Sequence, residues 1–273
     1  MQSATALKSD APQPGNVLSS KDGFVGTITF NNPARLNAMS LDMWTQTAAL
    51  LRDFAADDAV RVVILKGAGE KAFVSGADIS KFESERASAE AQARYNEAVD
   101  KVYGGLDEYP KPIIAMIRGY CVGGGLGLAL GCDLRICTPN SRFALPAAKL
   151  GLGYGYRSIK RFVDVLGPAF TQEIFFTARQ FSAQEAYDMG LVNRIVADGE
   201  LESYVKTYAD TIGGNAPLTI KAAKFAIRQA SKADSERDLK TVGELVKACM
   251  SSNDYIEGRR AFMEKRKPKF TGT

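Results

Sequence analysis

Residues 111–136 read KPIIAMIRGYCVGGGLGLALGCDLRI, and this stretch decides the fold. Its apolar start at 113–117 predicts a buried strand, and residues 134–137 predict another. Between them, the glycine triplet at 123–125 opens a run of alanine, leucine and glycine that carries no charge up to Gly131. A helix without a polar face is typical of a buried position. The stretch therefore predicts strand, buried helix, strand, within an α/β fold.

The flanking sequence extends this pattern toward the N-terminus. Residues 24–30 (FVGTITF) and 61–66 (RVVILK) are rich in β-branched side chains and predict two further strands. Ser40 resembles an N-cap, because apolar residues follow it at helical spacing. Residues 88–106 predict a second helix, which ends before Pro110.

The last third of the chain changes character. Pro217 fits the first position of a helix, and Ser251 with Asp254 resembles a capping box that opens the final helix. We therefore expect three parts: a flexible N-terminal arm at 1–20, an α/β core at 21–205 and a helical C-terminal region at 206–273.

Composition excludes several classes of function. The 273 residues are 45% apolar and 24% charged, as in ordinary soluble globular proteins, and the net charge is only +4. A balance this mild, without a basic stripe, argues against a nucleic-acid partner, and no apolar run is long enough to span a membrane. The first twenty residues lack the apolar core of a signal peptide, and the four cysteines form no CxxC pair. We expect free thiols and a cytoplasmic location.

Histidine is absent, which removes histidine-dependent triads, histidine general bases and most catalytic zinc sites, so no metal site is expected. Two glycine-containing turns remain as candidates, at 74–79 (VSGADI) and at 123–125. Neither reads as GxGxxG, so a dinucleotide site fits poorly. Each turn alone is compatible with mere packing. If both converge on one point, their backbone N–H groups make an oxyanion hole for a carbonyl oxygen.

Six motifs, in order, carry a resemblance to a known family. They are FNNPARLNAMS, KAFVSGADIS, the stretch quoted at the outset, FALPAAKLGLG, FSAQEAYDMGLVNRIV and DYIEGRRAFMEKRKPKF. Together they closely resemble the crotonase (enoyl-CoA hydratase/isomerase) family over roughly residues 20 to 270. The resemblance implies an α/β spiral of ββα units with a C-terminal helical trimerisation region, often paired as a hexamer (a dimer of trimers).

The resemblance also implies the site. The oxyanion donors are the N–H groups of Ala77 and Gly124. The substrate is an acyl-CoA thioester, so coenzyme A enters as part of the substrate and no cofactor is tightly bound. The coenzyme A contacts implied by position are Arg35, Leu36, Ala38, Gly76, Ala77, Asp78 and Ile79, with Phe262 and Lys265 from a neighbouring subunit.

The sequence departs from the hydratase pattern at two positions. Hydratases of the family carry one glutamate two residues after the glycine triplet and another after the proline of FxxPE, where this chain has Gly127 and Ala147. Hydration needs such general acid–base groups, so standard hydration is not expected. Tyr154, in GLGYGY, aligns with a tyrosine of the family's decarboxylases and is the third candidate catalytic residue, with a plain pocket wall as its alternative role.

Other polar residues near the predicted pocket are weaker candidates. Tyr156, Lys149 and Arg157 lie close to Tyr154 in the sequence, and Asp133 ends the buried helix, where a structural role is expected. The helix before Pro110 offers three further candidates for a displaced acid, which are Tyr95, Glu97 and Asp100.

The sequence therefore predicts a lyase or isomerase related to enoyl-CoA hydratases, which stabilises a thioester enolate in a backbone oxyanion hole. The alternatives are an acyl-CoA decarboxylase or isomerase, and a non-catalytic protein that binds acyl-CoA. A nucleotide-dependent oxidoreductase is a more distant rival.

Overall fold

A computed structural model describes residues 15–81, 85 and 87–273. Two sheets form its core. The larger contains, in spatial order, β1 (Asn16–Asp22), β2 (Val25–Asn31), β3 (Val62–Gly67), β5 (Ile113–Ile117), β7 (Leu134–Cys137) and β10 (Arg194–Ile195). Strand β1 pairs antiparallel with β2, and the other neighbours are parallel. All four strands predicted from the sequence are confirmed, with ends shifted by a residue at most.

The smaller sheet has the order β4 (Ala72–Val74), β6 (Tyr120–Val122), β8 (Arg142–Ala144) and β9 (Gln180–Ser182). Strands β4, β6 and β8 run parallel, each following a strand of the larger sheet by a short turn. Each turn of the chain's spiral thus contributes one strand to each sheet, and a helix follows. This confirms the predicted α/β spiral of ββα units.

Successive side chains along the strands of the larger sheet point alternately into two apolar layers. In β3, Val62 and Ile64 face one cluster while Val63 and Leu65 face the other. Such a period of two places successive side chains on opposite faces of the sheet. The larger cluster fills the space between the two sheets and under the helices, and the smaller is covered by α7 (Leu201–Gly214).

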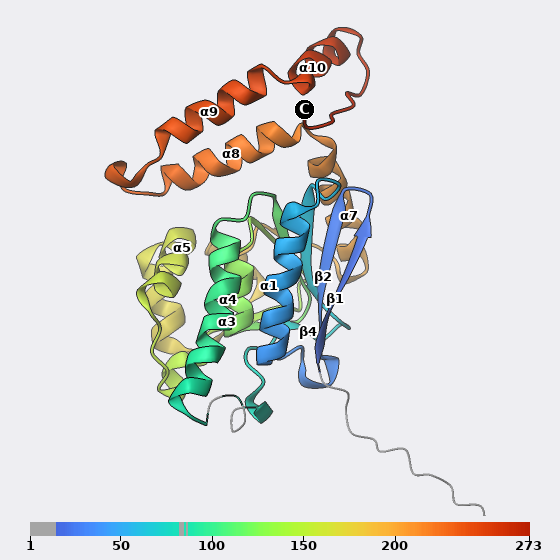
Figure 1. Cartoon of the computed structure of the whole chain (residues 1–273). Helices are drawn as coiled ribbons and strands as arrows, with labels where there is room; N and C mark the ends of the chain where they lie inside the picture. Colours follow the sequence, from blue (N-terminus) through green and yellow to red (C-terminus); the bar gives the residue numbers. More distant parts are fainter. Residues whose placement is uncertain (1–14, 82–84, 86) are drawn as a thin grey trace, which may run out of the picture.

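The core helices surround these sheets (Figure 1). They are α1 (Leu41–Ala56), α3 (Ala89–Asp107), α4 (Gly124–Leu130), α5 (Tyr156–Thr177) and α6 (Ala183–Asp188), with short 3₁₀ turns η1 (Pro33–Arg35), η2 (Ile79–Lys81), η3 (Pro146–Leu150) and η4 (Asp198–Glu200). Ser40 caps α1 by accepting a hydrogen bond from Met43 N, as predicted. Helix α4 is buried from Gly125 to Leu130, as its uncharged sequence predicts.

The C-terminal helices lie as a separate layer across one end of the core (Figure 1). They are α8 (Pro217–Ala230), η5 (Asp234–Glu236), α9 (Leu239–Met250) and α10 (Asn253–Met263). Pro217 is the first residue of α8, as predicted. The predicted cap of α10 is wrong by one residue, because Ser252 and not Ser251 accepts the hydrogen bond from Tyr255 N.

Two of the predicted boundaries between the three parts of the chain also need correction. Residues 1–14 of the expected arm lie outside the described residues, but residues 16–20 belong to β1. Their mostly polar side chains hide this strand, which is held by main-chain pairing with β2 and by buried Val17. The expected boundary between 205 and 206 falls inside α7, and α7 packs on the larger sheet as part of the core.

Candidate active site

The two glycine turns predicted from the sequence adjoin each other. Strands β4 and β6 are parallel neighbours, so the turns that follow them leave the same edge of the smaller sheet. Gly76 has φ +110° and Gly123 has φ +56°, conformations that favour glycine. A Cβ atom added to Gly123 would lie 3.6 Å from Cα of Gly76, which shows how closely the two backbones approach.

The two predicted oxyanion donors are amides without a hydrogen-bond partner in the described part of the chain. Gly124 is the first residue of α4, where a backbone N–H has no partner within its own helix. Its neighbour Gly123 N donates to Ala144 O at 2.9 Å. On the other turn, Asp78 N donates to Met39 O at 2.9 Å, while Ala77 N makes no such bond to any described residue. The adjacent amides of Gly123 and Asp78 are thus bonded to other backbone, whereas the amides of Ala77 and Gly124 have no acceptor among the described residues.

Residues 33–39 dock on the first glycine turn through main-chain bonds. Met39 N donates to Gly76 O at 2.8 Å and Ser75 N donates to Leu36 O at 3.1 Å. Arg35 forms an ion pair with buried Asp78 at 3.0 Å. The structure thus brings most of the predicted coenzyme A residues to one place, with Ala38 buried and Ile79 70% exposed at the surface.

Asn37 holds this loop and is not among the residues predicted from the sequence. The side chain is fully buried, its Nδ2 donates to Ala72 O at 2.7 Å, and its Oδ1 accepts from Asn32 N at 2.9 Å. Both Leu36 and Asn37 have positive φ, at 53° and 56°. Asparagine tolerates this conformation better than most residues, and that preference was the available signal.

Gly127 and Ala147, the two positions at which the resemblance to hydratases implies glutamates, are both buried. At Gly127, the space for a side chain is taken by Tyr103 of α3, because an added Cβ would lie 2.4 Å from Tyr103 Oη. The Tyr103 hydroxyl donates to Gly124 O at 3.2 Å. Sequence analysis missed Tyr103, since nothing in a one-dimensional pattern links it to Gly127 on another helix.

Tyr154 lies half-buried near the same region. Its ring meets Phe175 edge-on, with centroids 5.4 Å apart. Burial raises the pKa of Tyr154, and nearby Tyr95 raises it further. Burial also raises the pKa of Tyr103, and Tyr154 adds to that shift. Tyr103 and Tyr154 are therefore phenols that stay protonated at neutral pH.

Most other candidates near this loop and on α3 face elsewhere, whereas Tyr95 lies near Tyr103 and Tyr154. Tyr156 is 81% exposed, Lys149 is exposed, and Arg157 pairs with Asp107 on the surface. Glu97 pairs with Lys101 at 2.8 Å on the solvent side, and Asp100 is exposed. Tyr95 is buried and accepts a hydrogen bond from Trp44 Nε1 at 2.9 Å.

Asp133 has the predicted structural role. It accepts hydrogen bonds from Ile113 N at 2.7 Å and from Lys224 Nζ at 2.6 Å. Because Lys224 belongs to α8, Asp133 ties the C-terminal helices to the core.

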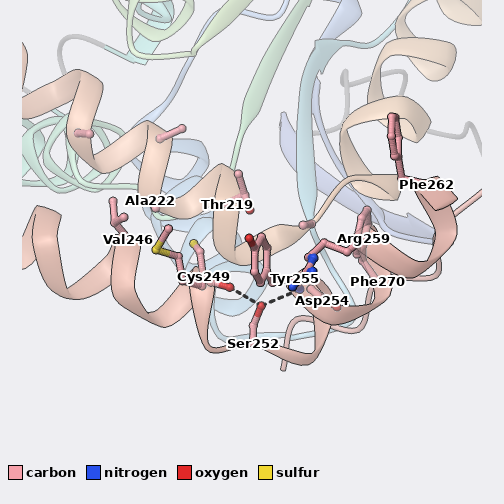
Figure 2. A pocket seen from close by; sticks show the side chains of 15 residues that line it. Thr219, Ala222, Val246, Cys249, Ser252, Asp254, Tyr255, Arg259, Phe262 and Phe270 are labelled. Atoms are coloured by element: carbon pink, nitrogen blue, oxygen red, sulfur yellow. Dashed lines mark hydrogen bonds between the residues drawn. The ribbon is translucent and has the colours of Figure 1, made fainter.

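Phe262 and Lys265 are not brought to the glycine turns of their own chain, since α10 lies at the far end of the molecule (Figure 1). Phe262 is 83% exposed beside an apolar groove of about 710 Å³ between α8, α9 and α10. Figure 2 shows Val246 and Cys249 toward one end of this groove and Phe262 toward the other. A role for Phe262 and Lys265 in the site requires a second copy of the chain.

Within the described residues, no group of histidine, cysteine, aspartate and glutamate side chains is arranged to hold a metal ion. The same residues include no helix long and apolar enough to cross a membrane.

The fold defines the class: a mixed α/β spiral of paired sheets whose turns end in two adjoining glycine motifs. The chain belongs to the enoyl-CoA hydratase/isomerase (crotonase) family, whose sequence profile matches residues 20–273. It is 36% identical to the short-chain-enoyl-CoA hydratase of Clostridium acetobutylicum over 92% of this chain and 96% of that protein. It is 32% identical to the peroxisomal Delta(3,5)-Delta(2,4)-dienoyl-CoA isomerase of Arabidopsis thaliana, over 91% and 93%.

A solved structure confirms the fold. An enoyl-CoA hydratase/carnithine racemase from Magnetospirillum magneticum superposes with a TM-score of 0.89 at 36% identity, covering 94% of this chain and 96% of that one.

Proposed function

We propose that this protein is an acyl-CoA-processing enzyme that stabilises a thioester enolate with the N–H groups of Ala77 and Gly124. The observation that carries the proposal is the contact between the two glycine turns, in which the amides of Ala77 and Gly124 have no acceptor among the described residues. Two such donors bind oxygen more tightly as it gains negative charge, which lowers the barrier to enolate formation. The enzyme relatives, a hydratase and an isomerase named for CoA substrates, support the same substrate class.

The reaction we propose is not standard hydration, because Gly127 and Ala147 supply no carboxylate to activate water. Loss of CO₂ from a 2-carboxyacyl-CoA fits better. The bond from Cα to the carboxylate breaks, its electron pair forms the enolate, and one proton then restores the thioester. These steps need no base, and half-buried Tyr154 is our candidate for a polar group next to the acyl chain. Isomerisation of an enoyl-CoA is the second form of the same enolate chemistry.

The coenzyme A moiety is proposed to lie along the loop at 33–39 and the Gly76–Ile79 turn. Phe262 and Lys265 would reach it from a neighbouring subunit in a trimer or a dimer of trimers. The exposed apolar groove between α8, α9 and α10 supports this assembly, because burial of apolar surface drives association. The buried free thiols of Cys121, Cys132 and Cys137 support a reducing compartment such as the cytoplasm.

The test is turnover of a thioester panel: malonyl-CoA, methylmalonyl-CoA, but-3-enoyl-CoA and crotonyl-CoA. We expect turnover of a carboxylated or isomerisable thioester and very slow hydration of crotonyl-CoA. Ala77→Pro, which deletes an N–H donor, should lower kcat by about 10²–10³-fold, whereas the control Ala77→Gly keeps the amide and most activity.

Binding of these thioesters without turnover would favour the non-catalytic alternative. Hydration of crotonyl-CoA at the rate of ordinary hydratases would show that an acid–base pair lies elsewhere in the site.

A further inference from the structure

Tyr103 of α3 projects onto the face of α4 that carries Gly124 and Gly127. A Cβ on Gly127 would lie 2.4 Å from Tyr103 Oη and 2.9 Å from its Cζ, distances that no real side chain tolerates. A Cβ on Gly124 would lie 3.8 Å from the same hydroxyl oxygen. The phenol therefore fills the space that the Cβ atom of a hydratase glutamate at position 127 would need. This space adjoins Gly124, which offers the second oxyanion amide.

The ring of Tyr103 is held on two sides. Trp44 meets it edge-on with centroids 5.7 Å apart, and the guanidinium of Arg161 lies 4.8 Å from its ring centroid. Arg161 is itself fixed by an ion pair with Asp107 and by donation to Tyr103 O at 3.2 Å. A ring fixed in this way keeps its hydroxyl in one place, which proton transfer in an active site requires.

The hydroxyl is equipped to donate. It gives its hydrogen bond to Gly124 O at 3.2 Å, which is long for an O–H donor and leaves the proton free to turn toward a bound ligand. Burial raises the pKa of Tyr103, so the group keeps its proton at neutral pH. A protonated phenol beside the oxyanion amides cannot act as a ground-state base but can protonate an enolate.

We propose that Tyr103 is the proton donor of this active site and that the glycine at 127 leaves the space that admits it. The inference rests on the proposed function. In the step, the Tyr103 O–H bond breaks and a Cα–H bond forms from the enolate electron pair. The thioester carbonyl is restored as negative charge leaves the oxygen between Ala77 and Gly124, and water returns a proton to the phenolate.

The test compares Tyr103→Phe with Tyr109→Phe on the best thioester of the panel. Tyr103→Phe keeps the ring against Trp44 and Arg161 and removes only the hydroxyl, so kcat should fall by about 10²–10⁴-fold with KM within threefold. Tyr109 is a matched control, because its buried hydroxyl has no partner among the described residues and lies beyond the end of α3. Its replacement should leave kcat unchanged.

Gly127→Ala supplies a second, independent variant, since its methyl group overlaps the Tyr103 hydroxyl and displaces it. It should also lower kcat, because the displaced ring no longer presents its hydroxyl at the same place. A Tyr103→Phe enzyme within threefold of wild type would overturn the inference.

The two proposals fail differently. If Ala77→Pro is inactive and Tyr103→Phe is normal, only the role of Tyr103 falls. If Ala77→Pro is as active as wild type, the enolate mechanism itself falls.

Discussion

At the scale of single residues, the phenol of Tyr103 and any side chain at position 127 compete for the same space. A glutamate at 127 needs the volume that the ring fills, so it cannot be introduced without first removing that ring. Whether position 127 can hold a carboxylate thus depends on a residue of another helix. Restoring the family's glutamates one at a time should therefore fail.

We expect Gly127→Glu alone to lower the free energy of unfolding by about 1–3 kcal/mol, through overpacking against Tyr103. Tyr103→Ala with Gly127→Glu and Ala147→Glu should relieve the overlap and supply both carboxylates. This triple variant should hydrate crotonyl-CoA faster than wild type, measured by loss of enoyl thioester absorbance. A Gly127→Glu protein as stable as wild type in urea would contradict the steric overlap between the two side chains.

At the scale of elements, local signals predicted most of the fold. The strand at 113–117 was found because both of its faces are buried, which makes its sequence a continuous apolar run. The strand at 24–30 was found because its sequence is rich in β-branched and aromatic residues, with buried Ile28 and Phe30 alternating with half-buried threonines. Strand β1 was missed because Val17 is its single buried side chain, so its sequence carries little apolar signal. Caps were found to within a residue: consecutive serines at 251 and 252 are equivalent in sequence, and only the backbone conformation selects Ser252.

The cap of α6 gives a prediction for pH. Glu185 accepts from Ser182 N at 2.8 Å and pairs with Arg179 at 2.7 Å, and these contacts lower the pKa of Glu185 from its ordinary 4.5 to about 2. A carboxylate whose pKa is lowered by folding stabilises the protein above its unfolded pKa and loses that contribution as pH falls.

Glu185→Ala should therefore cost about 1 kcal/mol at pH 7, the magnitude of an exposed cap. The difference from wild type should shrink between about pH 4.5 and pH 2 in urea titrations. The control Glu244→Ala removes an exposed helical glutamate with only a 3.9 Å contact to Lys240 and should have little effect. A deficit that stays constant across this range would show that the charge of Glu185 is not responsible.

At the scale of the whole molecule, the C-terminal layer is bound to the core at a few defined points. Lys224 reaches Asp133 and Lys111 O, while Arg61 donates to Phe270 O at 2.9 Å. Asp254 is buried and accepts from the amides of Thr271 and Gly272 at 2.7 and 2.9 Å, which folds the chain end back onto α10. The apolar groove is therefore presented by a fixed layer.

Met250, 65% exposed in that groove, should be buried in the proposed trimer. Met250→Asp should weaken assembly and shift the mass measured by light scattering toward the monomer. Loss of coenzyme A affinity should accompany it, since Phe262 and Lys265 would no longer reach a neighbour's site. The control Leu152→Asp changes an exposed apolar residue that does not line the groove. A wild-type protein that is monomeric at micromolar concentration would remove the basis for this prediction.

The site was only partly predictable for a physical reason. Its main-chain parts follow from glycines whose backbone conformation other residues rarely adopt, so Gly76 and Gly123 can be recognised in the sequence. Tyr103 makes its contacts across helices, and its significance depends on the space beside Gly127, which no sequence pattern records. Contacts between α3 and α4 had to be seen in three dimensions.

The distribution of the cysteines has a practical consequence. Burial raises the pKa of Cys121 well above its ordinary value and that of Cys132 and Cys137 to about 12, so these three thiols resist alkylation while the protein is folded. Of the four cysteines, only Cys249 borders the groove between the C-terminal helices. A maleimide dye would thus mark one position of the native chain, and its rate of attachment would report, without any engineered label, whether that face is open to solvent or covered.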